Sequence, residues 1–211
     1  MKKSIALVMM AVLLVAASVM GTLAYLTSKD TVKNTFTVGK VKITLDEAKV
    51  NTDGTLVPNA DRVKTNSYKL MPGHEYTKDP TVTVKEGSEE SYVRQIVTVS
   101  FNKVLTDNQL ATNLDNIFLG YSASVWVRNA KDVKTENGKT VITYEYRYKE
   151  TVTATDGDKK LPALFTGIKI PDDWTNETLA GFGEFEINIE AHAIQADGFT
   201  TADAAWAKFS N

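Results

Sequence analysis

The chain has 211 residues, with 24 Lys and Arg, 26 Asp and Glu, a formal net charge of −2 and no cysteine. The absence of thiols excludes cysteine catalysis, thiolate metal sites and disulfide bonds. The mild negative charge, without a basic face or interleaved basic and aromatic residues, argues against nucleic acid as a partner.

An apolar stretch opens the chain. Lys2 and Lys3 are followed by a run without charge that continues up to Lys29. The run is long enough for a membrane anchor, since about 20 apolar residues span a bilayer. It also has the order of a signal peptide, in which a short basic region precedes an apolar region and a cut at small residues.

The segment GTLAYLTSKD, at residues 21–30, favours cleavage. Thr22 and Ala24 are small residues at the −3 and −1 positions of a cut between Ala24 and Tyr25. No cluster of Lys or Arg follows as a stop-transfer signal. We therefore predict that signal peptidase removes residues 1–24 during export and that the membrane is contacted only through this segment before cleavage. An uncleaved N-terminal anchor is the alternative.

The mature chain, residues 25–211, is then secreted. Loss of Lys2 and Lys3 leaves 22 basic and 26 acidic residues, a net charge of −4. A chain of this length can bury a substantial core as one domain. It contains no internal repeat and no linker composition, so a single domain is predicted.

Apolar residues alternate with polar ones along the mature chain, which predicts strands. Gly39 interrupts the alternation of the first strand and suggests a bulge there. Asn137-Gly138 predicts a hairpin turn. The predicted strands cover residues 35–45, 80–86, 91–101, 121–129, 140–154, 163–170 and 183–196.

The last predicted strand has the most regular alternation, and one face of it is expected to lie in the core: Phe185, Ile187, Ile189, Ala191 and Ala193. Helical patterns are few. Residues 106–118 can hold a short helix, and TTADAAWAKF predicts a C-terminal helix capped by Thr200 or Thr201. The fold class predicted is all-β, an antiparallel jelly-roll-like β-sandwich with short helical additions and a C-terminal helix.

Residues suited to catalysis are scarce. The chain has two histidines, His74 and His192. His74-Glu75 begins like a zinc-protease motif, but the second histidine of that motif would fall at position 78, which is Lys. A zinc site of both histidines and a carboxylate is geometrically possible, whereas the simpler interpretation is a loop histidine and a strand histidine. No catalytic residue, metal site or cofactor is predicted, and residues 155–160 are interpreted as a hairpin turn rather than a calcium loop.

Two stretches resemble the TasA/camelysin family of exported proteins. The first runs from the signal boundary into the first strand, where Thr35, Phe36 and Gly39 occupy the family's Thr-Phe-x-x-Gly positions. The second is KLMPGHEYTKDPTVTV, in which a Leu-x-Pro-Gly turn precedes Thr-Lys-Asp and a strand. The matching residues of this second stretch are Leu70, Pro72, Gly73, Thr77, Lys78 and Asp79.

The resemblance covers residues 1–101 and implies a Gram-positive cell-surface or biofilm-matrix protein. It implies a jelly-roll subunit that assembles into fibres when the N-terminal segment of one mature subunit pairs with the sheet of its neighbour. The family also includes a metalloendopeptidase, camelysin, but this sequence lacks His-Glu-x-x-His.

The leading hypothesis is therefore a secreted structural subunit that forms homo-oligomers or fibres by β-strand addition. Residues 25–36 are the candidate donor segment, and a frayed terminus is the simpler interpretation of them. Two alternatives are a camelysin-type surface metalloendopeptidase and a monomeric adhesin that binds through exposed Trp126, Trp174 or Trp206. The expected apolar anchors of the donor segment are Tyr25, Leu26, Val32 and Phe36.

Overall fold

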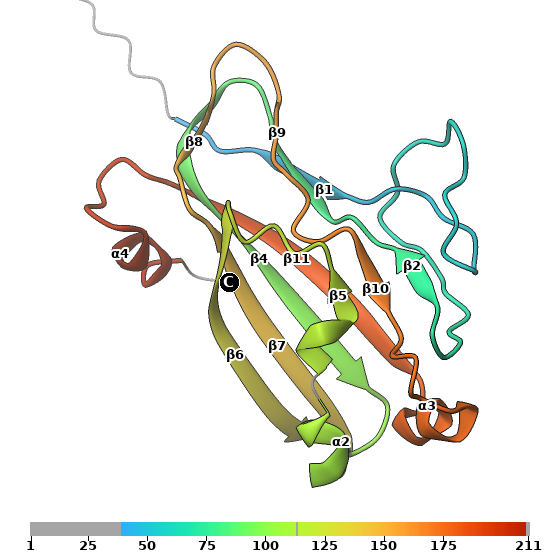
Figure 1. Cartoon of the computed structure of the whole chain (residues 1–211). Coiled ribbons are helices and arrows are strands. Elements are labelled where there is room, and N and C mark those ends of the chain that lie inside the picture. The colour runs from blue at the N-terminus through green and yellow to red at the C-terminus, as the bar shows by residue number, and fades with distance from the viewer. Residues whose placement is uncertain (1–38, 113, 210–211) are drawn as a thin grey trace, which may run out of the picture. The chain divides into compact units, whose positions relative to one another are not determined.

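Strand β4 (Ser88–Phe101) is the centre of the larger sheet in a computed structural model that describes residues 39–112 and 114–209 (Figure 1). It pairs antiparallel with β7 (Lys139–Tyr148) on one side and with β11 (Phe185–Gln195) on the other. Strand β6 (Trp126–Glu136) continues the sheet beyond β7, and β8 (Val152–Ala154) pairs with the beginning of β4. The order β11-β4-β7-β6, with β8 beside β4, makes one layer.

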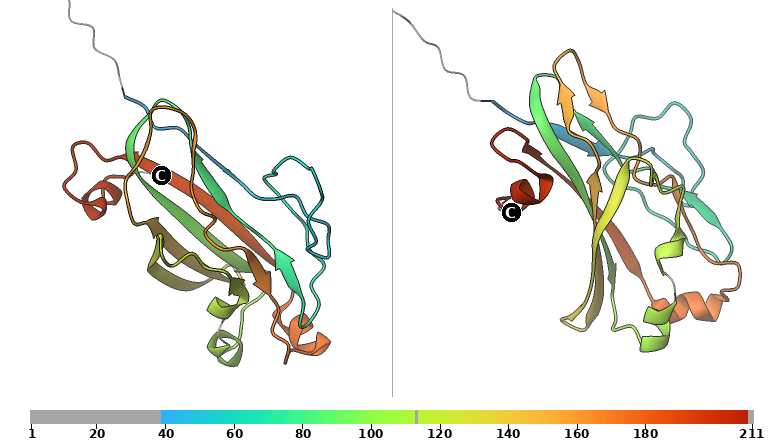
Figure 2. Two further views of the ribbon diagram at one scale, coloured as in Figure 1. Left: turned by 45° about the horizontal axis from the view of Figure 1, so that its top comes forward. Right: turned by 60° about the vertical axis from the view of Figure 1, so that its left-hand side comes forward.

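Two small sheets make the opposite layer (Figure 2). One has the order β1-β3-β9, and the other has the order β2-β10-β5; all their pairings are antiparallel. The prediction of an all-β antiparallel sandwich is confirmed. The strands are β1 (Ile43–Asp46), β2 (Glu75–Thr77), β3 (Thr81–Val84), β5 (Phe118–Leu119), β9 (Lys159–Lys160) and β10 (Gly167–Lys169).

The core lies between the layers because β4 and β7 alternate inward apolar and outward polar side chains. Val93, Val97 and Val99 of β4 are buried, and Ile142 and Tyr144 of β7 lie beside them. The opposite layer contributes buried valines from β3 and half-buried apolar side chains from β1. The buried members of this cluster include Val82, Val84, Phe101, Trp126, Tyr146, Leu164, Phe165 and Phe182.

The predicted inward face of the last strand is confirmed, although its side chains are only half-buried. They pack against the core cluster, and the reason for their partial exposure is that β11 is the last strand of its sheet. The five residues concerned are Phe185, Ile187, Ile189, Ala191 and Ala193.

The predicted hairpin at Asn137-Gly138 is confirmed between β6 and β7. Asn137 has φ +50° and Gly138 has φ +74°, the two positive angles that a type I′ turn requires. The strand boundaries predicted around it were wrong. Residues 121–125 form a loop that ends in a turn, so β6 begins only at Trp126. The predicted strand 140–154 divides into β7 and β8 at residues 149–151.

Two further predictions were wrong. Among the described residues, the first predicted strand begins only at Ile43, and Gly39 lies ahead of it instead of forming a bulge inside it. Residues 155–160 do not turn a hairpin, because they cross from β8 in the larger sheet to β9 in a small one. Asp158 fixes this crossing by accepting hydrogen bonds from the Lys85 side chain and the Glu86 amide.

The predicted helices are present but short. Thr106 caps α2 (Asp107–Ala111) in a capping box with Gln109, and a 3₁₀ turn, η1 (Leu114–Ile117), follows. Thr201 caps α4 (Ala202–Trp206), as one of the two predicted alternatives. Helix α3 (Asn176–Phe182) was not predicted, although Thr175 at its N-cap and Gly183 at its end are ordinary helix signals. Within residues 39–112 and 114–209, no helix is both long and apolar enough to cross a membrane.

Candidate functional site

The predicted cleavage and assembly residues cannot be placed in the fold. Ala24, Tyr25, Leu26, Val32 and Phe36 all lie outside the described residues. The structure does describe the edges of the larger sheet, which are the places where the strand-addition hypothesis expects a donor to pair.

The outer edge of β11 (the β11 edge) is long and regular. Among the described residues, β11 pairs only with β4, and it does so without a break in register from Phe185 to Gln195. Strand β1 packs near β11 but pairs only with β3. Unpaired N–H and C=O groups along a regular edge are a template for an additional strand.

The hydrogen bonds at both ends of β11 show which backbone groups face outward. Asn102 N–H donates to Glu184 O at 3.1 Å, and Ala196 N–H donates to Glu90 O at 2.8 Å. Because alternate residues of a strand direct their N–H and C=O groups to the same side, even-numbered residues bond to β4. The backbone groups of odd-numbered residues, from Phe185 to Gln195, therefore face the β11 edge.

The outer edge of β6 (the β6 edge) is less suited to receiving a strand. Its register shifts between Arg128 and Ala130, and every residue of the strand after Trp126 is exposed. Lys131 and Lys134 add positive charge along it. Bulges and charged side chains, lysine above all, are devices that protect sheet edges from pairing.

The two histidines lie in different surroundings. His74 is exposed next to the start of β2, and His192 lies in the middle of β11. Within residues 39–112 and 114–209, no three His, Asp or Glu side chains are grouped so that they could hold a metal ion.

His192 belongs to a cluster that holds α4 against the outer face of the larger sheet (Figure 2). Arg94 Nε donates to His192 Nδ1 at 3.1 Å, and its guanidinium lies 4.5 Å from the centre of the Trp206 ring. The Phe209 ring stacks on His192 at 4.8 Å. The remaining charged groups of the cluster are Glu145, Arg147, Glu190 and Asp203.

Acid should weaken this cluster. Burial first, and the Arg94 charge second, lower the pKa of His192 below 6.5, with Glu190 and Glu145 opposing the shift. The unfolded chain therefore takes up this proton at a higher pH than the folded chain does. We expect stability to fall as the pH drops from about 6.5 through the lowered pKa.

Urea unfolding at several pH values between 7.5 and 5 measures this effect. His192→Gln should make the dependence shallower, since glutamine keeps a polar side chain but does not titrate. Equal slopes for the wild type and the variant would contradict the assignment of this pH dependence to His192.

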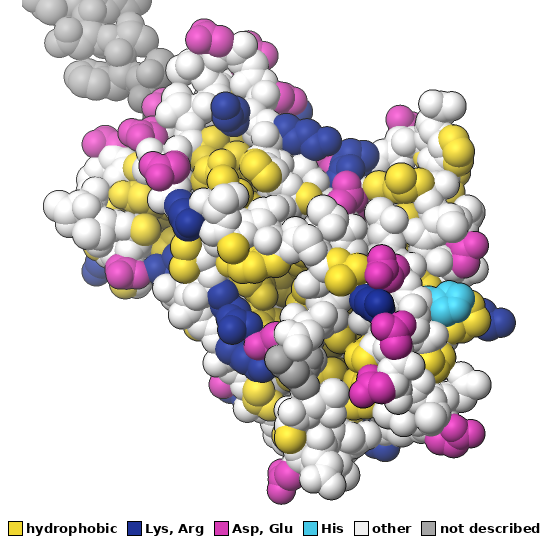
Figure 3. All heavy atoms as spheres, in the orientation of Figure 1, with side chains coloured by type: hydrophobic (Ala, Val, Ile, Leu, Met, Phe, Trp, Pro, Cys, Tyr) yellow, Lys and Arg dark blue, Asp and Glu magenta, His cyan; other side chains and the backbone are white. Residues whose placement is uncertain are grey.

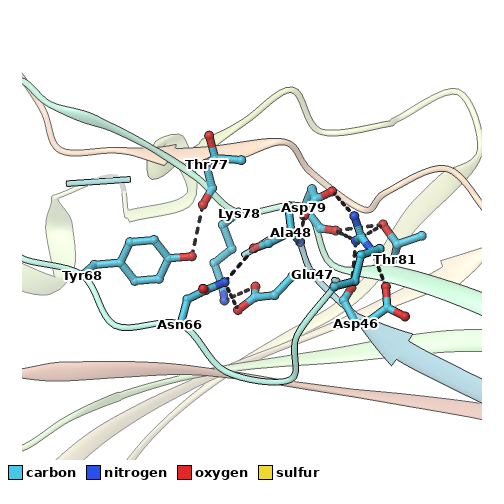
Figure 4. A network of polar contacts seen from close by, with 10 residues as sticks. Asp46, Glu47, Ala48, Asn66, Tyr68, Thr77, Lys78, Asp79 and Thr81 are labelled. Atoms are coloured by element: carbon cyan, nitrogen blue, oxygen red, sulfur yellow. Dashed lines mark hydrogen bonds and ion pairs between the residues drawn. The ribbon is translucent and has the colours of Figure 1, made fainter. Parts of the chain in front are cut away.

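Another polar network lies around the start of β3 and the end of β1 (Figure 4). The guanidinium of Arg62 binds the carboxylates of Asp46 and Asp79 and also donates to Thr81 Oγ1 at 3.0 Å. Asp79 Oδ1 in turn accepts the Ala48 amide at 2.6 Å. These contacts fasten the long loop, residues 47–74, to the sandwich.

The same network includes a buried ion pair. Lys78 Nζ lies 2.7 Å from Glu47 Oε2, and each side chain is 8% exposed. Asn66 Nδ2 donates to Glu47 Oε1 at 3.0 Å. The Tyr68 hydroxyl donates to Thr77 O at 3.1 Å, and burial first, with the Glu47 charge second, raises its pKa, so it remains a donor.

The Leu-x-Pro-Gly turn of the second resembling stretch lies directly before β2. His74 N–H donates to Met71 O at 3.3 Å, and Gly73 between them has φ +74°. Pro72 and Gly73 thus occupy the central positions of a type II turn. The resembling stretch therefore has a structural role: its turn enters β2, and its Thr77, Lys78 and Asp79 bind the loop.

The tryptophans do not form an exposed binding platform among the described residues. Trp126 and Trp206 are buried. Trp174 is half-buried and stacks on Phe182 at 4.4 Å. The exposed tryptophans on which the adhesin alternative relied are therefore not found among the described residues.

The face drawn in Figure 3 carries both basic and acidic side chains. The sheet topology defines the class as an all-β sandwich of antiparallel sheets. No protein-family model matches the chain, and neither a curated protein nor a solved structure shows significant similarity to it.

Proposed function

We propose that this chain is a secreted structural subunit of extracellular matrix or cell-surface fibres, and that its subunits join by β-strand addition. The resemblance of residues 1–101 to the TasA/camelysin family supports this proposal, as does the order of the apolar N-terminal stretch. The observation that carries it is the β11 edge, which is regular over 11 residues and unpaired among the described residues.

The donor in this proposal is residues 25–36 of a neighbouring subunit. This segment is close in length to β11, so its main chain can match the β11 edge over most of its length. Main-chain hydrogen bonds give such a contact its affinity, and alternating side chains give it register. Tyr25, Leu26, Val32 and Phe36 supply the apolar contacts.

Deletion of residues 25–36 tests the donor. We expect the truncated mature chain to remain folded, with a free energy of unfolding within about 0.5 kcal/mol of the wild type, because the core cluster lies downstream. Fibres seen by negative-stain microscopy should disappear. Unfolding of the truncated chain would show that the segment belongs to its own subunit's sheet.

Ala193→Pro tests the receiving edge. Residue 193 directs its N–H toward the β11 edge, so proline removes a donor from that edge and none from the pairing with β4. Fibre yield should fall while circular dichroism shows a folded domain. Ala193→Ser keeps the N–H group and serves as the matched control. Equal yields from both variants would exclude the β11 edge as the receiver.

A further inference from the structure

Glu47 and two side chains bound to it have the composition of a self-acylating site (Figure 4). The Glu47 carboxyl group binds the Lys78 amine at 2.7 Å through Oε2 and the Asn66 carboxamide at 3.0 Å through Oε1. An amine nucleophile, a carboxamide electrophile and an acid–base group therefore meet at one carboxyl group. The proposed fibre function does not require this arrangement.

Burial shields the acid and the amine from water. Glu47 and Lys78 are buried, and the Tyr68 ring centre lies 5.8 Å from Lys78 Nζ. Burying two separate charges is unfavourable. Movement of one proton along the hydrogen bond between Nζ and Oε2 converts the ammonium and carboxylate into an amine and a carboxylic acid. A neutral lysine amine is a nucleophile.

The carboxamide is held in a fixed orientation by the backbone of the loop. Val50 N–H donates to Asn66 Oδ1 at 3.1 Å, and Asn66 Nδ2 donates to Ala48 O at 2.8 Å. The Val50 amide points at the oxygen on which negative charge develops when a nucleophile attacks Cγ. A backbone donor so placed stabilises the tetrahedral intermediate of acyl transfer.

We propose that Lys78 and Asn66 join in an intramolecular isopeptide bond, with Glu47 as the proton carrier. Lys78 Nζ forms a bond to Asn66 Cγ, and the electron pair of the carbonyl moves to Oδ1. Glu47 gives Nδ2 the proton that it received from Lys78, the bond between Cγ and Nδ2 breaks, and ammonia leaves. Glu47 then holds the proton that Nζ loses as the amide forms. No oxidant, reductant or other reactant is consumed.

The bond would fasten the loop 47–74 to the segment that leads into β3. The two residues are 12 positions apart in the sequence, and closing a loop of this size restricts the unfolded chain as a disulfide does. A chain without cysteine would thereby gain a covalent link that does not depend on redox conditions.

Peptide mapping of the purified full-length or secreted wild-type protein tests the proposal. Trypsin should yield one branched peptide, residues 65–69 joined to residues 70–85, because a modified Lys78 is not cleaved. Its mass should equal the sum of the masses of the two separate peptides minus one ammonia molecule. Fragmentation should place the link at Asn66 and Lys78.

Three variants separate chemistry from mere proximity. Asn66→Ala removes the electrophile and leaves the ion pair intact, and Glu47→Gln removes the proton carrier while keeping both reacting groups. Both should lose the branched peptide completely, and the intact mass of each should then equal the mass calculated from its sequence. Lys49→Met changes a nearby exposed lysine and should leave the branched peptide unchanged.

The proposal fails if wild-type protein, held folded at neutral pH, gives only linear peptides ending at Lys78. It also fails if the branched peptide persists in Asn66→Ala. Circular dichroism of each variant shows whether the domain is folded. If Glu47→Gln does not fold, Asn66→Ala alone tests the proposal, because the Asn66 side chain is only half-buried and its replacement should leave the domain folded.

Discussion

Replacing Glu47 with alanine should destabilise the domain by about 3–5 kcal/mol, the usual effect of removing one partner from a buried ion pair. Lys78 would be left buried without its carboxylate, and Asn66 would lose an acceptor. Urea unfolding followed by tryptophan fluorescence measures the change.

The double variant Glu47→Leu with Lys78→Met is the informative control. It removes both charges and fills their space with apolar atoms, so its stability should exceed that of Glu47→Ala, in which the proposed link is also absent. A double variant as unstable as Glu47→Ala would show that the hydrogen bonds of Asn66 and the loop, and not the unpaired charge, dominate the effect.

Trp126→Ala should have an effect of similar size, about 3–5 kcal/mol, as for large aromatic residues in cores. The side chain is 0% exposed, its indole donates to Pro162 O at 3.0 Å, and its ring meets Tyr148 edge to face at 5.1 Å. Truncation therefore leaves a cavity and an unpaired carbonyl in one place.

The neighbouring residue offers a matched control. Val127 is 45% exposed on the same strand, so Val127→Ala should change the free energy of unfolding by no more than about 0.5 kcal/mol. Thermal unfolding and urea unfolding should agree on the order of the two variants. A Trp126→Ala protein as stable as Val127→Ala would contradict the placement of Trp126 in the core.

The network around Arg62 and Lys78 gives a physical meaning to the second resembling stretch. Asp79 joins Arg62 to the Ala48 amide, and Lys78 pairs with Glu47, so two consecutive residues hold two different points of the loop. The Met71–His74 turn then directs the chain into β2. The proposed isopeptide bond would make one of these attachments permanent.

The sequence by itself determined the fold class and the longest elements. Alternation in residues 91–101 and 183–196 predicted β4 and β11, and Asn137-Gly138 predicted the hairpin, because strand period and turn angles are local properties. Thr201 likewise predicted the start of α4. Shorter strands such as β5 and β9 were missed, since two residues carry no period.

Only the tertiary structure decided which edges stay unpaired and which polar groups meet. The even and odd faces of β11 were readable from the sequence, but its place at the end of the sheet depends on pairing with β4, which is distant along the chain. The sequence shows Lys78 in place of a zinc-motif histidine and within the second resembling stretch, but it does not show the pairing with Glu47, which is 31 residues away. Contacts at such separations arise when the chain folds back on itself, and no local pattern encodes them.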